Sequence, residues 1–169
     1  MPRMEHIIDF VGSRPSRSKL DLTDGYHNIR IHPESVKDST FCCHMGKFDS
    51  LVLQQGDCNA PATMMRAMNF LFRNIQDLMI YLDDILIGNY TYGEQIKTIR
   101  AVIKRAKDNK LWFYGNKSQF MPARMQILGN ILTDQGLEAD ADKIETILKF
   151  PTPGNTRQLQ RFLGMTNYL

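Results

Sequence analysis

Two neighbouring carboxylates, Asp83 and Asp84, interrupt the apolar run MIYLDDILIG of residues 79–88. Like charges placed together in this way favour the binding of a hard divalent cation, because the cation cancels their repulsion. The apolar residues on either side are typical of short strands, and a two-residue link between such strands predicts a tight hairpin with both aspartates at its tip. A solvated turn explains the same residues, since turns often contain aspartate. The pair by itself leaves both interpretations open.

A third carboxylate, Asp21, lies in the apolar segment SKLDL of residues 18–22, which is typical of a strand. A carboxylate among buried apolar residues either has a raised pKa or finds a cation, and the spacing shows no obligatory lysine partner. One kind of divalent metal shared by Asp21, Asp83 and Asp84 accounts for all three positions. The alternative is that Asp21 ends its strand and hydrogen-bonds a local backbone amide, and the spacing does not separate the two.

The elements that must position these residues alternate between strands and helices. Strands are predicted at residues 18–22, in a hairpin pair around Gly46, and around residues 112–114 and 125–132. One amphipathic helix begins after Asn59 as its N-cap, and a second follows the aspartate hairpin. Their apolar stripes are Met64, Met68, Leu71 and Ile75 in the first helix and Ile96, Ile99, Ile103 and Ala106 in the second. This order predicts an α+β fold, an antiparallel sheet with helices packed on one face.

The composition limits the kinds of protein to which the chain can belong. Its 169 residues are 43% hydrophobic, which is enough to bury a core. No run approaches the ~20 apolar residues of a membrane span, and the N-terminal residues lack the apolar core of a secretory signal. We therefore expect no membrane partner and an intracellular location, cytoplasmic or nuclear.

The three cysteines, Cys42, Cys43 and Cys58, fit reduced thiols in such a compartment better than disulfides. Together with His44 they raise the alternative of a zinc site. Adjacent strand residues point to opposite faces, however, and no pair has the usual two-residue spacing, so the sequence disfavours zinc.

The net charge is +3, and its distribution along the chain is uneven. Between Lys97 and Asn130 there are eight basic residues against the single acid Asp108. The basic residues are Lys97, Arg100, Lys104, Arg105, Lys107, Lys110, Lys117 and Arg124. Such a segment could face a polyanion, although a solvated helix face is the commoner explanation for a run of charge.

Five segments resemble, in this order, the successive motifs of reverse transcriptases of gypsy-class long-terminal-repeat retrotransposons. They are SKLDLTDGYHNIRI, QQGDCNAPATMMRAMN, IYLDDILI, NKSQF and the C-terminal stretch from ILGNILTDQG to the end. The resemblance covers essentially the whole chain. It implies a polymerase palm over residues 1–138, with the fingers largely missing, and the truncated start of a thumb over residues 139–169. Within the latter, residues 140–150 predict a capped helix ended by Pro151, and a further helix begins near Thr156.

The resemblance also implies the roles of individual residues. Asp21, Asp83 and Asp84, with the Leu22 carbonyl, would hold two Mg²⁺ ions, for which Mn²⁺ can substitute. Tyr26 would be the aromatic gate that excludes a 2′-hydroxyl, where a core tyrosine is the alternative. The remaining implied contacts are to the nucleotide or the primer: Asp24, Gly25, Gln55 and Gly56 near the triphosphate, Lys117 as a general acid near pyrophosphate, and Leu128 and Gly129 in the primer grip.

These implied roles describe the palm of an RNA-directed DNA polymerase, which transfers nucleotides to a primer 3′-hydroxyl. We expect the isolated chain to have weak polymerase activity or none. Its partners would be an RNA or DNA template with primer, deoxynucleoside triphosphates, and other parts of a retroelement polyprotein. Two alternatives remain: a non-catalytic nucleic-acid-binding module, and a structural or interaction protein derived from a retroelement remnant. The intact acidic triad favours the enzyme.

Overall fold

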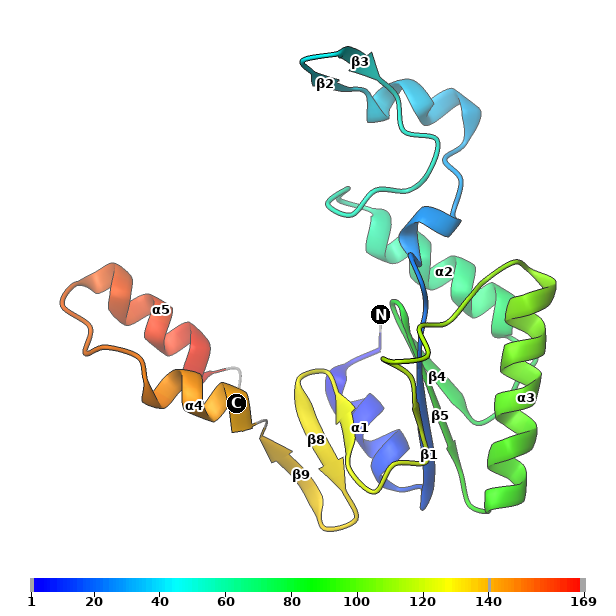
Figure 1. Ribbon diagram of the computed structural model, residues 1–169, viewed down its shortest axis with the longest axis vertical. Coiled ribbons are helices and arrows are strands. Elements are labelled where there is room, and N and C mark those ends of the chain that lie inside the picture. Colours follow the sequence, from blue (N-terminus) through cyan, green and yellow to red (C-terminus); the bar gives the residue numbers. More distant parts are fainter. Residues whose placement is uncertain (1, 140, 168–169) are drawn as a thin grey trace. The chain divides into compact units, whose positions relative to one another are not determined.

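The computed structural model describes residues 2–139 and 141–167, with the side chain of residue 142 excepted. The chain divides into two compact units, and the boundary between them falls between Pro122 and Ala123. These units are defined by internal packing, and the functional division into palm and thumb near residue 138 remains a prediction. Figure 1 shows the elements of both units.

The first unit is built on a four-stranded antiparallel sheet in the order β4-β5-β1-β6. Its strands are β1 (Ser16–Asp21), β4 (Leu78–Tyr81), β5 (Asp84–Asn89) and β6 (Gln119–Phe120). The helices of this unit are α1 (Met4–Gly12), α2 (Ala60–Phe72) and α3 (Tyr92–Asp108), with short 3₁₀ turns η1 (Tyr26–Asn28) and η2 (Pro33–Ser39). The predicted α+β class with an antiparallel sheet is confirmed.

One face of the sheet carries the main core, which α2 and α3 cover (Figure 1). Side chains alternate along a strand, so Leu20 of β1 and Ile85 and Ile87 of β5 point to this face. Helix α2 contributes Met64, Met68 and Phe72 as a continuous apolar stripe. The helix begins after Asn59 as predicted, although the Asn59 side chain makes no capping hydrogen bond.

Helix α3 differs at two positions from its predicted stripe, because Gln95 and Val102 are buried where Ile96 and Ile103 were expected. Its core-facing residues are Gln95, Ile99, Val102 and Ala106, while Ile103 is 41% exposed. At about 100° of rotation per residue, Gln95, Ile99, Val102 and Ala106 fall on one narrow face of the helix, and Ile96 and Ile103 lie to one side of it. The helix starts at a capping box, in which Thr91 and Glu94 bond each other's backbone amides.

The opposite face of the sheet meets α1, a helix that the sequence patterns did not predict. Gly88 of β5 points to this face, and a Cβ built there would approach Phe10 of α1 at 3.5 Å. Ile7 and Val11 of α1 are fully buried. The sheet is therefore covered on both faces along β5, and the end of β5 that carries Asp84 lies beyond these contacts in the register.

Between η2 and α2 the chain forms the predicted hairpin near Gly46, from β2 (Phe41–Cys43) and β3 (Gly46–Phe48). Both strands are exposed, and the rings of Phe41 and Phe48 stack on each other at 5.9 Å. All three cysteines are free and exposed.

The second unit contains a three-stranded antiparallel sheet and two helices. The strands are β7 (Met125–Ile127), β8 (Asn130–Thr133) and β9 (Gly136–Ala139), followed by α4 (Ala141–Leu148) and α5 (Thr156–Thr166). The predicted hairpin between β7 and β8 is present, and its turn residues Leu128 and Gly129 both have positive φ. The cap predicted for α4 at residue 140 and the end of the last predicted helix at residues 168–169 lie outside the described residues.

Candidate active site

The three acidic residues meet at one end of the sheet in the first unit. Asp21 ends β1 and Asp84 begins β5, and the two are direct partners in the antiparallel register. Opposite residues in such a pair point to the same face, which here is the face away from the α2–α3 core. Asp83 precedes Asp84 in the turn, so all three carboxylates share one end of the sheet.

The hairpin differs by one residue from its prediction. Its two-residue turn consists of Leu82 and Asp83, because Tyr81 pairs with Asp84 across β4 and β5. Asp84 is thus the first strand residue rather than a tip residue. Leu82 adopts a φ of 54°, a conformation that is rare for leucine, and its N–H donates to the Met65 sulfur at 3.1 Å. A strained residue directly before two carboxylates is typical of a functional turn.

Asp83 is the carboxylate with the least compensation. Burial first, and then the neighbouring Asp21 and Asp84 charges, raise the pKa of Asp83 above its ordinary value. Its Oδ1 atom is buried and has no hydrogen-bond partner among the described residues. Gly25 packs directly on it, since a Cβ built at Gly25 would overlap Asp83 Oδ1. A buried acceptor without a partner is expensive, so this atom is suited to a cation.

Asp84 has a partner that the sequence analysis missed. The Lys19 ammonium lies 3.0 Å from Asp84 Oδ2, and both side chains are less than one-fifth exposed. Burial raises the pKa of Asp84, and Lys19 and Lys117 lower it without cancelling the rise. The signal was present, because Lys19 precedes Asp21 by two residues on one strand and therefore shares its face.

The segment from Trp112 to Ser118 runs beside the end of β1. The Tyr114 N–H donates to the Asp21 carbonyl at 2.9 Å, and the Asp21 N–H donates to Ser118 Oγ at 3.2 Å. This segment brings Lys117 within electrostatic range of Asp84, with the Lys117 ammonium 4.9 Å from the centre of the Tyr114 ring. The structure thus brings Lys117 together with the acidic residues.

Tyr26 and Leu22 are buried beside the acidic residues. Tyr26 is 9% exposed and belongs to the core cluster, as its alternative interpretation as a core tyrosine expects. Burial and the nearby Asp83 charge raise the pKa of its hydroxyl. The Leu22 N–H donates to the Asp83 carbonyl at 2.9 Å, which ties the two loops together.

The other predicted nucleotide contacts are more loosely placed. Asp24 is exposed, has a φ of 50°, and accepts a hydrogen bond from Asn28 on its carbonyl. Gln55 and Gly56 are exposed in the loop before α2, where Gly56 has a φ of 106°. No described contact joins Gln55 or Gly56 to the acidic residues.

The described side chains do not form a ready metal cage. Among them no group of three His, Cys, Asp or Glu residues could hold a metal ion as it stands. One reason is visible in the site itself, since the Asp84 carboxylate pairs with Lys19. The donor set still fits a hard cation, because all three residues offer carboxylate oxygens and one oxygen is buried without a partner.

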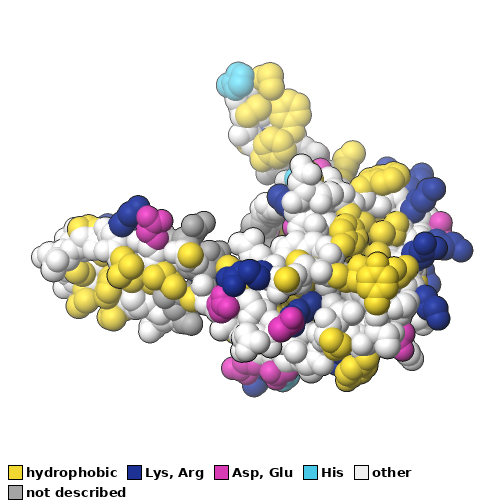
Figure 2. Space-filling model, turned by 60° about the horizontal axis from the view of Figure 1, so that its bottom comes forward, with side chains coloured by type: hydrophobic (Ala, Val, Ile, Leu, Met, Phe, Trp, Pro, Cys, Tyr) yellow, Lys and Arg dark blue, Asp and Glu magenta, His cyan; other side chains and the backbone are white. Residues whose placement is uncertain are grey.

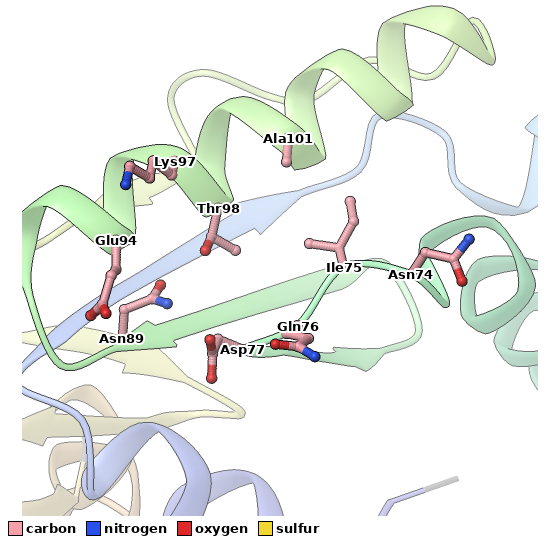
Figure 3. A pocket seen from close by; sticks show the side chains of 9 residues that line it. All are labelled: Asn74, Ile75, Gln76, Asp77, Asn89, Glu94, Lys97, Thr98 and Ala101. Carbon is pink, nitrogen blue, oxygen red and sulfur yellow. The ribbon is translucent and has the colours of Figure 1, made fainter.

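A hollow of about 390 Å³ lies between α3, the loop of residues 74–77 before β4, and Asn89 at the end of β5 (Figure 3). Its acidic residues are already engaged: Glu94 closes the α3 capping box, and Asp77 lies 3.7 Å from the Arg14 guanidinium. None of the predicted site residues lines this hollow. It is therefore separate from the candidate active site.

Solved structures show which fold this arrangement represents. The chain matches a foamy viral protease-reverse transcriptase in complex with RNA/DNA hybrid, with a TM-score of 0.89 and 23% identity over 98% of this chain and 23% of that chain. It also matches the foamy viral enzyme in complex with dsDNA, with a TM-score of 0.90 and 23% identity over 99% of this chain and 35% of that one. The fold is that of a reverse transcriptase polymerase domain.

Sequence relatives identify the family. Residues 5–166 match the family described as reverse transcriptase (RNA-dependent DNA polymerase), and the chain belongs to this family. It is 30% identical to the Retrovirus-related Pol polyprotein from transposon 297 of Drosophila melanogaster, over 99% of this chain and 16% of the relative. It is 28% identical to the Transposon Tf2-3 polyprotein of Schizosaccharomyces pombe, over 100% of this chain and 13% of the relative.

The chain therefore spans about a sixth of the curated relatives or less, and these relatives are retrotransposon polyproteins. Reverse transcriptases generally depend on divalent metals. Among the described residues no helix is both long and apolar enough to cross a membrane.

Proposed function

We propose that the chain is the palm region and the start of the thumb of an RNA-directed DNA polymerase from a gypsy-class retrotransposon. The order of the five sequence motifs supports the gypsy class, with the palm at residues 1–138 and the thumb from residue 139. The observation that carries the proposal is the meeting of Asp21, Asp83 and Asp84 at one end of the sheet, with Asp83 Oδ1 buried and unpartnered.

Asp21, Asp83 and Asp84, with the Leu22 carbonyl, would hold two Mg²⁺ ions. Bound there, the ions would supply charge neutralisation and a lowered pKa for the primer 3′-hydroxyl. The chain's own residues provide the positioning: the β1–β5 register fixes Asp21 against Asp84, and the Leu22–Asp83 hydrogen bond fixes the turn. No covalent intermediate on the protein is needed, so positioning and electrostatics can supply the rate.

Residues around the acidic end would bind the nucleotide. Tyr26 would form the wall beneath the sugar, and its buried position near the Asp83 charge supports this role. The backbone near Asp24 and Gly25 would meet the triphosphate, and Lys117 would donate a proton near the departing pyrophosphate. Gln55 and Gly56, exposed before α2, would contact the incoming nucleotide from the other side.

The proposed partners are a primer annealed to an RNA or DNA template, deoxynucleoside triphosphates, and other segments of the parent polyprotein. Both matched foamy viral structures are titled as nucleic-acid complexes, one with RNA/DNA hybrid and one with dsDNA. An intracellular site of action, cytoplasmic or nuclear, is part of the same proposal.

Primer extension on an RNA template with deoxynucleotides and Mg²⁺ tests the activity. We expect little extension by the chain alone and more by a chimera that adds the preceding segment of the transposon 297 polyprotein. Asp83→Asn should lower extension by about a hundredfold or more, because it removes charge where the reaction needs it. The exposed Asp108→Asn variant is the matched control, and equal losses in both variants would contradict the assignment.

Metal binding has an independent readout. Mn²⁺ should raise the melting temperature of the wild-type chain, and the rise should be smaller for Asp83→Asn and Asp21→Asn. An identical rise in all three proteins would show that these carboxylates do not bind the ion.

A non-catalytic nucleic-acid-binding module is the second candidate. Exposed basic residues of α3, such as Arg100 and Lys104, favour it. A chimera that folds and binds primer–template without ever extending it would support this candidate over the enzyme.

A further inference from the structure

A hydrophobic groove lies at the edge of the main sheet, between α3 and β6. Its volume is about 310 Å³, and its lining includes Ile103, Lys107, Leu111, Trp112, Phe113 and Phe120. We call this site the edge groove. None of the acidic residues lines the groove, although its lining residue Ser118 accepts the N–H of Asp21.

The groove exists because the helices do not cover the last strand. Helix α3 packs on β5 and β1, whereas β6 has only two residues and forms the sheet edge. Phe120 pairs with Ser18, so it points to the same face as Leu20, but no helix lies over it. Phe120 is consequently 50% exposed above a floor that contains the buried Leu20 and Leu111.

The rim of the groove is more apolar than a solvated surface requires. Trp112 is 61% exposed, and Ile103, at the helix side, is 41% exposed. Thr23 donates its N–H to the Trp112 carbonyl, and Leu22 pairs with Phe113, so the backbone on this side is fixed to β1. Large apolar side chains held on a fixed backbone around a hollow are typical of an interaction site.

The one charged residue that lines the groove is basic. Lys107 lines the groove, and Arg100, Ile103 and Lys107 follow one another at helical spacing on α3. Lys110 stands next to the floor residue Leu111 in the chain. Asp108 is the one acid between residues 97 and 130. Figure 2 shows Lys and Arg side chains beside hydrophobic ones on the first unit.

We propose that the edge groove binds an acidic peptide segment of a partner protein that inserts one or two apolar side chains. Apolar side chains fit the hollow, whose lining offers few polar groups, and acidic flanking residues complement Lys107, Arg100 and Lys110. A nucleic acid fits less well, since base edges and sugars would find almost no hydrogen-bonding groups in the groove. The one lining hydroxyl, on Ser118, already accepts the N–H of Asp21.

The chain carries its own reporter for this site. Trp112 is the single tryptophan of the sequence. Its emission should shift to shorter wavelength when a ligand covers it, and in the free chain it should be open to acrylamide quenching. A Trp112 already shielded in the free chain would mean that the groove is filled, and would overturn the proposal.

The probe is a synthetic peptide of glutamates with leucines at positions i, i+3 and i+7, titrated into the full chain. Two matched peptides replace either the glutamates by lysines or the leucines by serines. We expect a saturable emission shift with the Glu/Leu peptide only. Equal shifts with the Lys/Leu peptide, or no shift with any peptide, would refute the acidic segment as occupant.

Substitutions locate the binding. Ile103→Ser should weaken the Glu/Leu peptide about tenfold or more, because an apolar contact is lost. Lys107→Glu should weaken it as well, while Lys97→Glu, the same charge change on α3 away from the groove, should not. Equal effects of Lys107→Glu and Lys97→Glu would reduce the attraction to net charge and contradict the proposal.

Two further measurements separate the alternatives. Asp83→Asn should bind the peptide like the wild type, so failure of the proposed polymerase function would leave this result unchanged. An oligothymidylate that outcompetes the peptide and quenches Trp112 equally in wild type and Ile103→Ser would assign the face to nucleic acid and overturn the peptide proposal.

Discussion

At the scale of single residues, the acidic end of the sheet is held together against its own repulsion. Asp83 and Asp84 both have a raised pKa because burial disfavours their charged forms. Lys19 offsets part of the cost of burying the Asp84 charge, whereas Asp83 Oδ1 has no hydrogen-bond partner among the described residues. In the proposed metal site, this repulsion lowers the stability of the metal-free chain and favours the binding of a cation.

Asp83→Asn should therefore stabilise the metal-free chain at neutral pH. Between the ordinary pKa of 3.8 and the raised folded value, the folded chain binds more protons at Asp83 than the unfolded chain does. The free energy of unfolding thus falls as the pH rises through this window. Asparagine does not ionise, so the melting-temperature difference between variant and wild type should be near zero at pH 3 and grow towards neutral pH.

Thermal melts followed by circular dichroism from pH 3 to pH 8 without divalent ions measure this difference. Asp108→Asn controls for the loss of one carboxylate. A constant difference across the whole range would show that Asp83 does not titrate with folding.

Lys19→Met should destabilise the metal-free chain by roughly 1–3 kcal/mol, since a charge-assisted contact of a half-buried carboxylate is lost. The double variant Lys19→Met/Asp84→Asn should recover much of this loss, because no unpaired carboxylate remains at that position. Urea unfolding of the four proteins in this cycle gives the coupling free energy. Additive effects would mean that the 3.0 Å contact contributes nothing.

At the scale of elements, close packing of the turn after β1 holds the acidic hairpin in place. A Cβ at Gly25 would overlap Asp83 Oδ1 and lie 2.8 Å from Met64 Cε of α2. Gly25→Ala should lower the free energy of unfolding by about 1–3 kcal/mol and shift Asp83. Circular dichroism melts measure the change.

Gly93→Ala is the matched control for this substitution. Gly93 lies in the first turn of α3 with nothing within 4 Å of its Cβ position, so alanine there should be neutral or stabilising by up to ~1 kcal/mol. Similar melting temperatures for the two alanine variants would contradict the packing argument.

Much of this element scale could be predicted from periodicity. The strand ending at Asp21, the hairpins, and the amphipathic α2 and α3 follow from local patterns of apolar residues. Helix α1 was missed because it has only nine residues and no capping side chain marks its start. The exact turn was misplaced because the left-handed conformation of Leu82, whose N–H donates to the Met65 sulfur of α2, depends on tertiary contacts.

The sequence predicted which residues belong to the candidate site better than it predicted the contacts between them. The pairing of Asp21 with Asp84 depends on the register of β1 with β5. A register shift by one residue would place the two carboxylates on opposite faces of the sheet. The spacing along β1 places Lys19 on the same face as Asp21, but its pairing with Asp84, 65 positions away, also depends on the register of β1 with β5. The motif NKSQF singled out Lys117, but the hydrogen bonds that hold its segment beside β1, from the Tyr114 N–H to the Asp21 carbonyl and from the Asp21 N–H to Ser118 Oγ, could not be read from the sequence.

At the scale of the whole molecule, the basic segment predicts how the chain meets nucleic acid. Affinity for a primer–template should fall steeply with salt, because each phosphate contact releases counterions. Lys104→Gln, on the exposed side of α3, should reduce the slope of log affinity against log salt by about one. Lys37→Gln, on an exposed residue of η2, is the control for losing one charge.

Both slopes can be measured by fluorescence anisotropy of a labelled primer–template. The salt concentration should run from about 50 to 300 mM, a range over which phosphate contacts change the affinity strongly. If Lys104→Gln and Lys37→Gln have the same effect, binding follows net charge and the α3 segment has no special part in it.

The ion pair between Lys19 and Asp84 has a consequence for ion selectivity. Any cation that binds Asp84 must first displace an ammonium group that is already in place and already desolvated. A monovalent ion brings no more charge than Lys19 and so gains nothing by the exchange, whereas a divalent ion gains a second unit of attraction to the same carboxylates. Lys19 therefore competes with cations for Asp84, and it would favour divalent ions over monovalent ones such as potassium.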